Sequence, residues 1–424
     1  MLQDRYGNDL ATSSAQTRDL YIEAVDKLLG AGPGMRAAFE AVTASDPGFA
    51  LGHSGLARAC QITGDATAAR ASMATARSLA GGLSAKDASH LNALGLLIDG
   101  KGPAAYPAIR AHVSEYPRDV MIAQICTSVF GLIGFSGKPG REAELLAYTT
   151  SLQPHYGDDW WFLSQHAFSM CETGILDRAD QMIDRALSIK PDNAHGAHVR
   201  AHIYYEAGEA QAGMDYLHGW LPGYDPHGLM HSHISWHLAL WTLGQGDMDG
   251  VWSLVDRYIA PDASLSFPLI VMTDNAAILY RAALAGHPVS VERWQAIADY
   301  AHRYFPNTGV AFADVHAALA YAMVGESDAL AAIVANPAGP AADVVRELAS
   351  AFQSIIDQDW PGAAAHLAVG MADHARIGGS RAQRDLLEHT MVAVLLKQGQ
   401  GDEARRMLAM RRPVQAGKAP VAGL

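Results

Sequence analysis

Apolar and small residues recur along the chain at the spacing of helices that bury one face. One apolar run begins at Trp160 and ends at Gly174, and a second, with alanines on one side, covers 179–189 before Pro191. Glycine directly after one helix and proline beyond the next are typical helix ends. This stretch therefore predicts two helices joined by a tight turn.

The same pattern returns after 34 residues, so that Gly174 corresponds to Gly208 and Ala167 to Ala201. A helix–turn–helix unit of this length is the tetratricopeptide signature. Further helix pairs are expected around 64–76 and 100–117 and over 236–258, 311–334, 345–374 and 382–410. Because one unit cannot bury its own apolar face, the units are expected to stack. We therefore predict an all-α fold, a tetratricopeptide-like solenoid of helical hairpins that forms a right-handed superhelix.

The array is expected to be continuous, because no linker rich in serine or proline divides the chain. We predict roughly 10 helix pairs over residues 1–412. The glycine-rich stretch 132–140 is expected to be a loop, and 221–229 an insertion between two repeats. Residues 413–424 are expected to form a flexible tail.

The composition narrows the classes of function. The 31 basic and 44 acidic residues give a net charge of −13, which disfavours nucleic-acid binding through a basic surface. Three widely spaced cysteines without a Cys-x-x-Cys motif fit a reducing compartment. No apolar run approaches the roughly 20 residues that span a bilayer. We expect a cytoplasmic protein that binds neither nucleic acid nor a membrane.

Several segments with unusual polar residues carry a family resemblance. They are DPGFALGH at 46–53, HVRAHI at 198–203, HISWHLAL at 233–240, DNAAILYR at 274–281, RWQ at 293–295, FADVH at 312–316 and GGSRAQRD at 378–385. With these segments the chain resembles the tetratricopeptide repeat protein 38 family over nearly its whole length. The resemblance implies a helical repeat array and no particular activity. One departure is Tyr205, which stands where the family usually has an acidic residue; Glu206 follows it.

Histidines are concentrated in the middle of the chain, where eight of the 19 lie between residues 193 and 241. Two pairs share one spacing, His198 with His202 and His233 with His237. Residues four apart on a helix lie on one face, about one turn from each other. Both pairs fall on the first helix of a hairpin, which lines the inside of this kind of superhelix. The sequence therefore predicts four imidazoles in one internal pocket.

The first helices of other hairpins carry further polar candidates. As catalytic residues we consider His198, His202, His233, His237, Asp274 and Asp314, and as ligand-binding residues Arg281, His316, Tyr205, Trp236, Arg384, Asp385 and Gln165. Imidazoles exchange protons near neutrality, and an aspartate can orient the ring. Arginine can bind a carboxylate or phosphate through two parallel hydrogen bonds. The alternative is that these residues form ion pairs between helices or belong to the core.

A zinc ion is one option for the pocket. His198 and His202 have a suitable spacing, and Glu206 lies a further turn along the same side. However, Val199 follows His198, so the chain has no His-Glu-x-x-His motif. Acid–base chemistry by neutral imidazoles needs no metal.

Two functions follow as hypotheses. In the first, the internal pocket binds a small polar or anionic molecule and, in one version, converts it as an acid–base or metal-assisted hydrolase or lyase. In the second, the protein is a scaffold whose concave groove binds a peptide or a partner's helix. A homodimer is compatible with both. The number of histidines favours the first, because a peptide groove does not require them. The sequence specifies neither a substrate nor a reaction type.

Overall fold

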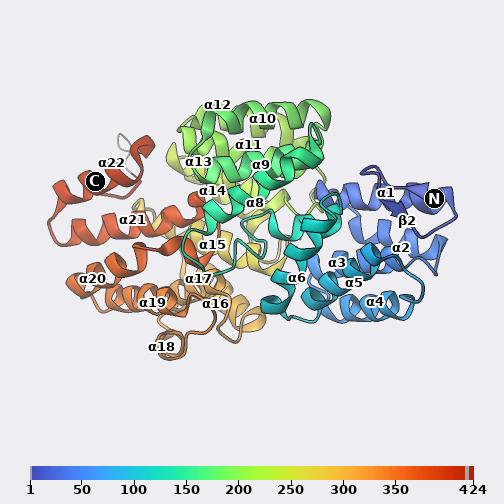
Figure 1. Cartoon of the computed structure of the whole chain (residues 1–424). Coiled ribbons are helices and arrows are strands. Elements are labelled where there is room, and N and C mark those ends of the chain that lie inside the picture. Colours follow the sequence, from blue (N-terminus) through green and yellow to red (C-terminus); the bar gives the residue numbers. More distant parts are fainter. Residues whose placement is uncertain (1, 416–419) are drawn as a thin grey trace.

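The computed structural model describes residues 2–415 and 420–424, which contain 22 α-helices arranged as successive hairpins (Figure 1). The β-structure in this part of the chain is a two-stranded antiparallel hairpin, β1 (Leu2–Gln3) with β2 (Asp9–Leu10). The predicted all-α class and its paired helices are confirmed.

The helices follow the predicted order of first and second helices with one irregular pair. The pairs are α1 (Ala15–Leu29) with α2 (Met35–Ser45), α3 (Ala50–Ile62) with α4 (Ala66–Ser78), α5 (Ala85–Ile98) with α6 (Gly102–Glu115), α9 (Trp160–Glu172) with α10 (Leu176–Ile189), α11 (Ala194–Ala207) with α12 (Ala210–Trp220), α13 (His231–Gly244) with α14 (Met248–Leu254), α15 (Pro268–Leu284) with α16 (Val291–Tyr304), α17 (Ala311–Val324) with α18 (Ser327–Ala335), α19 (Ala342–Ile356) with α20 (Trp360–Met371) and α21 (Arg381–Lys397) with α22 (Gly401–Arg411). The irregular pair is α7 (Val120–Ala123), extended by the 3-10 helix η1 (Gln124–Cys126), with α8 (Arg141–Tyr156). A π-helix, η3 (Val255–Ile259), continues α14, and η2 (Leu221–Gly223), η4 (His374–Ile377) and η5 (Pro413–Gln415) are short helices between or after the pairs.

Hairpin α9–α10 shows how the sequence produces an inner and an outer helix. The Asp159 carboxylate caps α9 by accepting from the N–H of Phe162 at 3.0 Å. Gly174 ends the helix with φ +81°, a left-handed conformation that glycine adopts without strain. All 13 residues of α9 are buried, whereas α10 buries only the stripe Ala179, Ile183 and Ala186. The first helix is therefore inside and the second covers it, as the sequence predicts.

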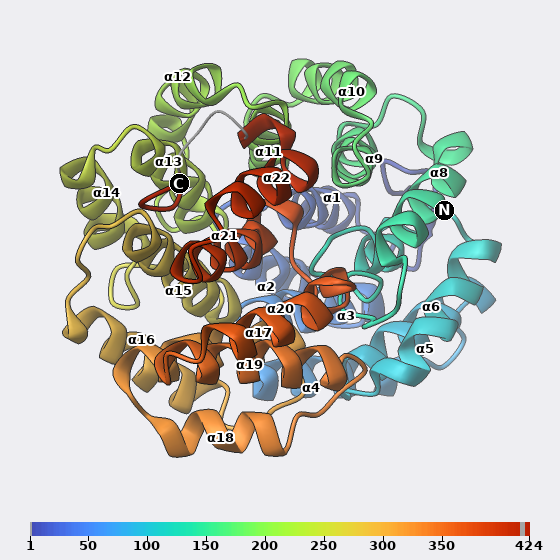
Figure 2. The same cartoon turned by 90° about the vertical axis from the view of Figure 1, so that its left-hand side faces the viewer.

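The hairpins follow one another around a ring when the molecule is viewed from its C-terminal side (Figure 2). In that view α1 to α3 lie behind the centre and α20 to α22 in front of it. Helix α21 is buried over 13 of its 17 residues and packs against α15 and α11. The inner side of the superhelix is therefore covered by the chain's own helix near its C-terminal end.

Contacts between distant segments hold the superhelix closed. The buried Arg141 guanidinium on α8 donates to the backbone carbonyls of Ala375 and Gly379. At the other end, the N–H of Ala194 donates to the carbonyl of Gly30 at 3.1 Å. Hydrogen bonds across more than 150 residues of sequence require the superhelix to return on itself, so its interior is enclosed by several helical layers.

The two predicted interruptions are present as irregular segments, and both turn inward. Between η1 and α8, Phe130 and Phe135 pack toward the core. In 221–229, Tyr224 is buried and donates to the carbonyl of Ala31 at 2.6 Å. Where we expected a flexible tail, η5 forms and Gln415 is buried; residues 416–419 lie outside the described part of the chain. Among the described helices, none combines the length and apolar character needed to cross a membrane.

Candidate functional site

The structure brings the four paired histidines together inside the superhelix. His198 and His202 extend from α11, and His233 and His237 from α13. The ring centroids of His202 and His237 are 4.4 Å apart, and those of His198 and His233 are 4.8 Å apart. One nitrogen from each of the four rings lies within 4.8 Å of the other three. We call these four residues the histidine cluster.

The histidine cluster is shielded from water. The four residues expose at most 5% of their surface. Burial, reinforced by the neighbouring histidines, holds the pKa of His198, His202 and His237 well below its usual value. These three imidazoles are therefore neutral at physiological pH, and each has a nitrogen lone pair.

A carboxylate orients one ring. Asp274 on α15 accepts a hydrogen bond of 2.6 Å from Nδ1 of His233, which leaves Nε2 as the ring nitrogen that does not contact Asp274. Burial raises the pKa of Asp274, and His233 counteracts that rise. Within residues 2–415 and 420–424, His233 Nε2 and both ring nitrogens of His237 have no hydrogen-bond partner. The Nε2 atoms of His198 and His202 are 2.8 Å apart.

Aromatic side chains set the orientation of the rings. Trp236 stacks on His233 with centroids 5.4 Å apart and an interplanar angle of 10°. Phe168 packs against His202 at 4.8 Å. Arg281 lies over the face of Trp236, 5.9 Å from the ring centroid. Trp236, predicted as a ligand-binding residue, thus acts on the cluster by packing.

A cavity of about 410 Å³ adjoins the histidine cluster. Its polar lining consists of Arg58, Gln61, Gln124, Ser128, Gln165, His195, His198 and His233. The rest of the wall is apolar and includes Phe130, Phe135 and Leu229 from the two irregular segments. No aspartate or glutamate among the described residues lines this cavity, so Arg58 gives its wall a positive charge.

Arg58, on the inner helix α3, is a residue that the sequence interpretation missed. Its guanidinium donates to the side-chain oxygens of Gln61 at 2.7 Å and Gln124 at 3.3 Å. In the described part of the chain, its Nε has no partner. Burial lowers the pKa of Arg58 to about 10, so it stays charged near neutrality. The available signal was an arginine among small apolar residues on a first helix, Leu56-Ala57-Arg58-Ala59-Cys60.

His195 was also missed, although it belongs to the histidine-rich stretch. It lines the cavity one turn before His198, and burial lowers its pKa to about 4. Gln165, which was predicted, lies in the same wall. The cavity thus combines one cation, neutral imidazoles and amides with a large apolar surface.

Other predicted residues form a separate polar network beside α21. The Tyr205 hydroxyl donates to Asp385 at 2.9 Å, and Arg281 donates to Tyr205 at 3.1 Å. Gln415 donates to Asp385 at 2.9 Å, and Arg412 pairs with the other oxygen of that carboxylate at 2.9 Å. Burial, with the Asp385 charge, raises the pKa of Tyr205 to about 12. Tyr205, Arg281 and Gln415 line a second cavity of about 270 Å³.

Glu206 and Asp314, both predicted as candidate site residues, do not join the histidine cluster. Glu206, proposed as a third zinc ligand, pairs with Arg412 through both carboxylate oxygens at 2.8 and 3.1 Å, and that prediction is corrected. Asp314 accepts from the N–H of Gly309 at 2.9 Å, and burial raises its pKa to about 6.

His316 and Arg384 likewise make contacts within and between helices. His316 Nδ1 donates to the carbonyl of Phe312 at 2.7 Å, and burial lowers the pKa of His316 to about 4. Arg384 pairs with Glu142 and donates to the carbonyl of Gly379. For Arg384, Asp385 and Glu206, the inter-helix ion pair left open as an alternative is what the structure contains.

A second buried group, made of His90, His112 and Asp119, differs from the histidine cluster in the hydrogen bonding of its rings. Both ring nitrogens of each histidine have partners: Ser54 and Asp119 for His90, and Ser89 and Asp119 for His112. Burial disfavours the charged form of Asp119, but the two imidazoles hold the pKa of this carboxyl well below its usual value. Its hydrogen bonds join α5, α6 and the start of α7, which is a structural role.

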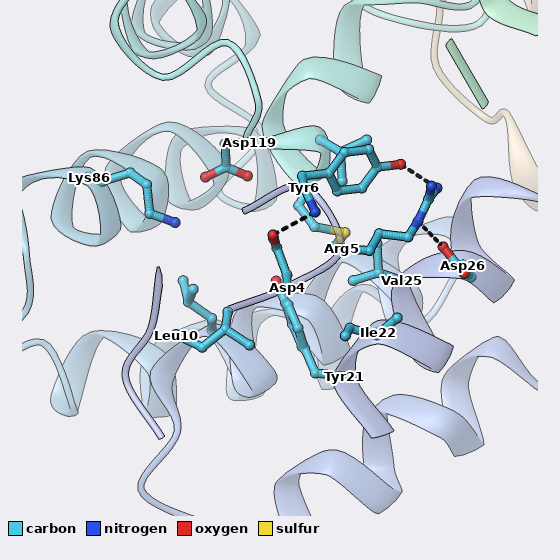
Figure 3. Close-up of a pocket in the computed structure, with 13 residues that line it drawn as sticks. Asp4, Arg5, Tyr6, Leu10, Tyr21, Ile22, Val25, Asp26, Lys86 and Asp119 are labelled. Carbon is cyan, nitrogen blue, oxygen red and sulfur yellow. Dashed lines mark hydrogen bonds and ion pairs between the residues drawn. The ribbon is translucent and has the colours of Figure 1, made fainter. Parts of the chain in front are cut away.

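Asp119 also borders a small N-terminal cavity with Lys86, Asp4 and Tyr6 (Figure 3). Asp4 accepts from the N–H of Tyr6 at 2.9 Å, and Arg5 donates to Asp26 at 2.7 Å. The cavity volume is about 10 Å³, which holds at most a water molecule. This cavity is too small for a substrate.

The paired helices, their inner and outer faces and their closed superhelix define a helical repeat protein of the tetratricopeptide type. No family model matches the chain. It is similar to the human IFIT1 dimer with m7Gppp-AAAA, with TM-score 0.45, 12% identity and coverage of 96% of this chain and 97% of that one. It is also similar to yeast Tom70, with TM-score 0.37, 12% identity and coverage of 94% and 85%. The P58(IPK) TPR domain gives TM-score 0.22, 14% identity and coverage of 91% and 99%.

Proposed function

We propose that this protein binds a small organic anion with an apolar body in the cavity of about 410 Å³. The observation that carries the proposal is Arg58, a cation that faces a largely apolar cavity and that, within residues 2–415 and 420–424, has no carboxylate partner. A carboxylate is the simplest anion of this class, because its two oxygens match the planar guanidinium fork.

The size and lining of the cavity support a small ligand. Small-molecule sites usually have volumes of about 300–1,000 Å³, with mainly apolar walls and a few polar groups that fix orientation. A buried cation gains most when an anion replaces the water that it lost. His195 and His198, whose pKa values burial lowers, lie in the same wall, so neutral imidazoles would be available to a bound anion for acid–base chemistry.

The scaffold alternative places a peptide or a partner's helix along the concave side. Helix α21 packs against α11 and α15 there, which disfavours an extended peptide at that position. Membership of the tetratricopeptide repeat protein 38 family, a cytoplasmic location and a homodimer remain parts of the proposal. The first rests on the quoted segments, and the second on three buried free cysteines.

The proposal is tested by titrating linear carboxylates of increasing chain length and the matched primary alcohols, with binding measured by calorimetry. Carboxylates should bind more tightly than the alcohols. Arg58→Met should weaken carboxylate binding about 10- to 150-fold, because hydrogen bonds to charged groups contribute about 1.5–3 kcal/mol. Arg70→Met, at an exposed arginine of α4, is the matched control and should change nothing. Equal affinity for alcohols, no saturable carboxylate binding, or unchanged affinity in Arg58→Met would overturn the proposal.

A further inference from the structure

We propose that the histidine cluster binds one divalent first-row transition-metal ion through the four imidazoles. The ligand atoms would be Nε2 of His198, His202 and His233 and one ring nitrogen of His237. This site goes beyond the proposed anion binding, which needs no metal ion. Imidazole suits zinc, copper, nickel and iron, and zinc is the probe we choose.

The first reason is the unused hydrogen-bonding capacity of the rings. A buried polar atom without a partner costs about 1–3 kcal/mol. In the described part of the chain His233 Nε2 and both ring nitrogens of His237 have no partner although both residues are buried, while Nε2 of His198 and Nε2 of His202 have only each other, 2.8 Å apart. In the group of His90, His112 and Asp119 every ring nitrogen is paired. The group of His90, His112 and Asp119 therefore shows what a fully paired buried group looks like, and the histidine cluster differs from it by three ring nitrogens on His233 and His237 that have no partner among the described residues.

The second reason is the role of Asp274. Metal-binding histidines commonly donate their other ring N–H to a carboxylate, which fixes the tautomer and directs the lone pair at the metal. Asp274 accepts from Nδ1 of His233 at 2.6 Å and leaves Nε2 to face the cluster. Asp274 is a positioning residue in this arrangement, because its oxygen contacts the ligand and not the metal.

The third reason is the spacing of the ring nitrogens. Metal–nitrogen bonds of about 2.0–2.1 Å in a tetrahedral site place ligand nitrogens about 3.3 Å apart. The four nitrogens already lie within 4.8 Å of one another, and those of His198 and His202 are 2.8 Å apart. Small rotations of the rings are enough to enclose an ion.

An ion bound by the histidine cluster would lie at the wall of the cavity of about 410 Å³, because His198 and His233 line that cavity. The negative charge of Asp274 would balance only part of the 2+ charge of the ion. The ion would therefore add a second positive group to the wall that already contains Arg58.

The experiment is a calorimetric titration of chelator-treated, full-length protein with zinc. We expect one equivalent to bind to wild type. His237→Ala should weaken zinc binding at least about 100-fold. Asp274→Asn should weaken it about 10- to 100-fold, because His233 then loses the carboxylate that orients its ring. His227→Ala, at an exposed histidine, and Arg58→Met should both bind zinc as wild type does. The Arg58 variant separates this proposal from that of anion binding.

A measurement on the wild-type protein tests the proposal even if His237→Ala fails to fold. Cobalt added in place of zinc should give the intense visible absorption of a tetrahedral ion and saturate at one equivalent. No saturable zinc binding, zinc binding that His237→Ala leaves unchanged, or only the weak absorption of octahedral cobalt would overturn the proposal.

Discussion

Acidification from about pH 7 to pH 5.5 should destabilise the metal-free protein, because its buried histidines are neutral. Burial lowers the pKa of eight histidines to about 4 or well below the usual value: His166, His195, His198, His202, His237, His316, His374 and His389. An unfolded histidine binds a proton below about 6.5, whereas these folded ones do so only at lower pH. The stability that these neutral histidines contribute to the folded state is therefore fully present above about pH 6.5, and it is lost as the pH falls toward their pKa in the folded state.

The size of the effect follows from proton linkage. Between pH 7 and 5.5 the contribution of each of these histidines to the free energy of unfolding falls by about 1.2 kcal/mol, or by about 10 kcal/mol for the eight. Two buried carboxyls act in the opposite direction, since burial raises the pKa of Glu172 to about 7 and of Asp314 to about 6. These carboxyls take up protons in the folded state over the same pH range, which stabilises the folded state by about 2 kcal/mol. The net loss in the free energy of unfolding should be about 8 kcal/mol.

Urea unfolding at a series of pH values measures this loss in the presence of a chelator. His237→Gln removes one of the eight histidines and should reduce the pH-dependent loss by about 1.2 kcal/mol. His227→Gln, at a side chain that is 76% exposed, should leave the pH dependence unchanged. A free energy of unfolding that stays constant or rises as the pH falls would refute the inference that the buried imidazoles are neutral.

Two further predictions concern the closure of the superhelix. Glu206→Gln should lower the free energy of unfolding by about 3 kcal/mol, because Arg412 then loses a buried ionic partner; a change below about 1 kcal/mol in urea unfolding would contradict this. Arg141→Met should speed hydrogen exchange in α21 but not in α4, because Arg141 joins α8 to the carbonyls of Ala375 and Gly379. Unchanged exchange in α21 would show that these bonds do not hold the C-terminal helices in place.

The fold was predictable because its information is local. Gly174 and Gly208 both end helices in the left-handed conformation, 34 residues apart, as the repeat period requires. The meeting of His198, His202, His233 and His237 was predictable for a similar reason. The spacing of four places each pair on one helix face, and adjacent hairpins place the two faces side by side.

Contacts between distant segments could not be predicted in this way. Glu206 has the right helical spacing for a ligand of the histidine pair, but Arg412 approaches it from 206 residues away and neutralises it. The cavity is likewise assembled from helices of different hairpins, so the significance of Arg58 on α3 emerges only when α9, α11 and α13 are placed around it. The repeat period fixes neighbouring hairpins, but it does not specify which turns of the superhelix meet.

The most direct test of the central claim is a crystal structure of the zinc-loaded protein with anomalous data collected at the zinc absorption edge. We expect one strong anomalous peak within about 2.0–2.2 Å of a nitrogen from each of His198, His202, His233 and His237, with Asp274 bonded to the far side of His233. Imidazoles in separate surroundings, or a zinc peak at other residues, would contradict the claim that the inner helices build one site.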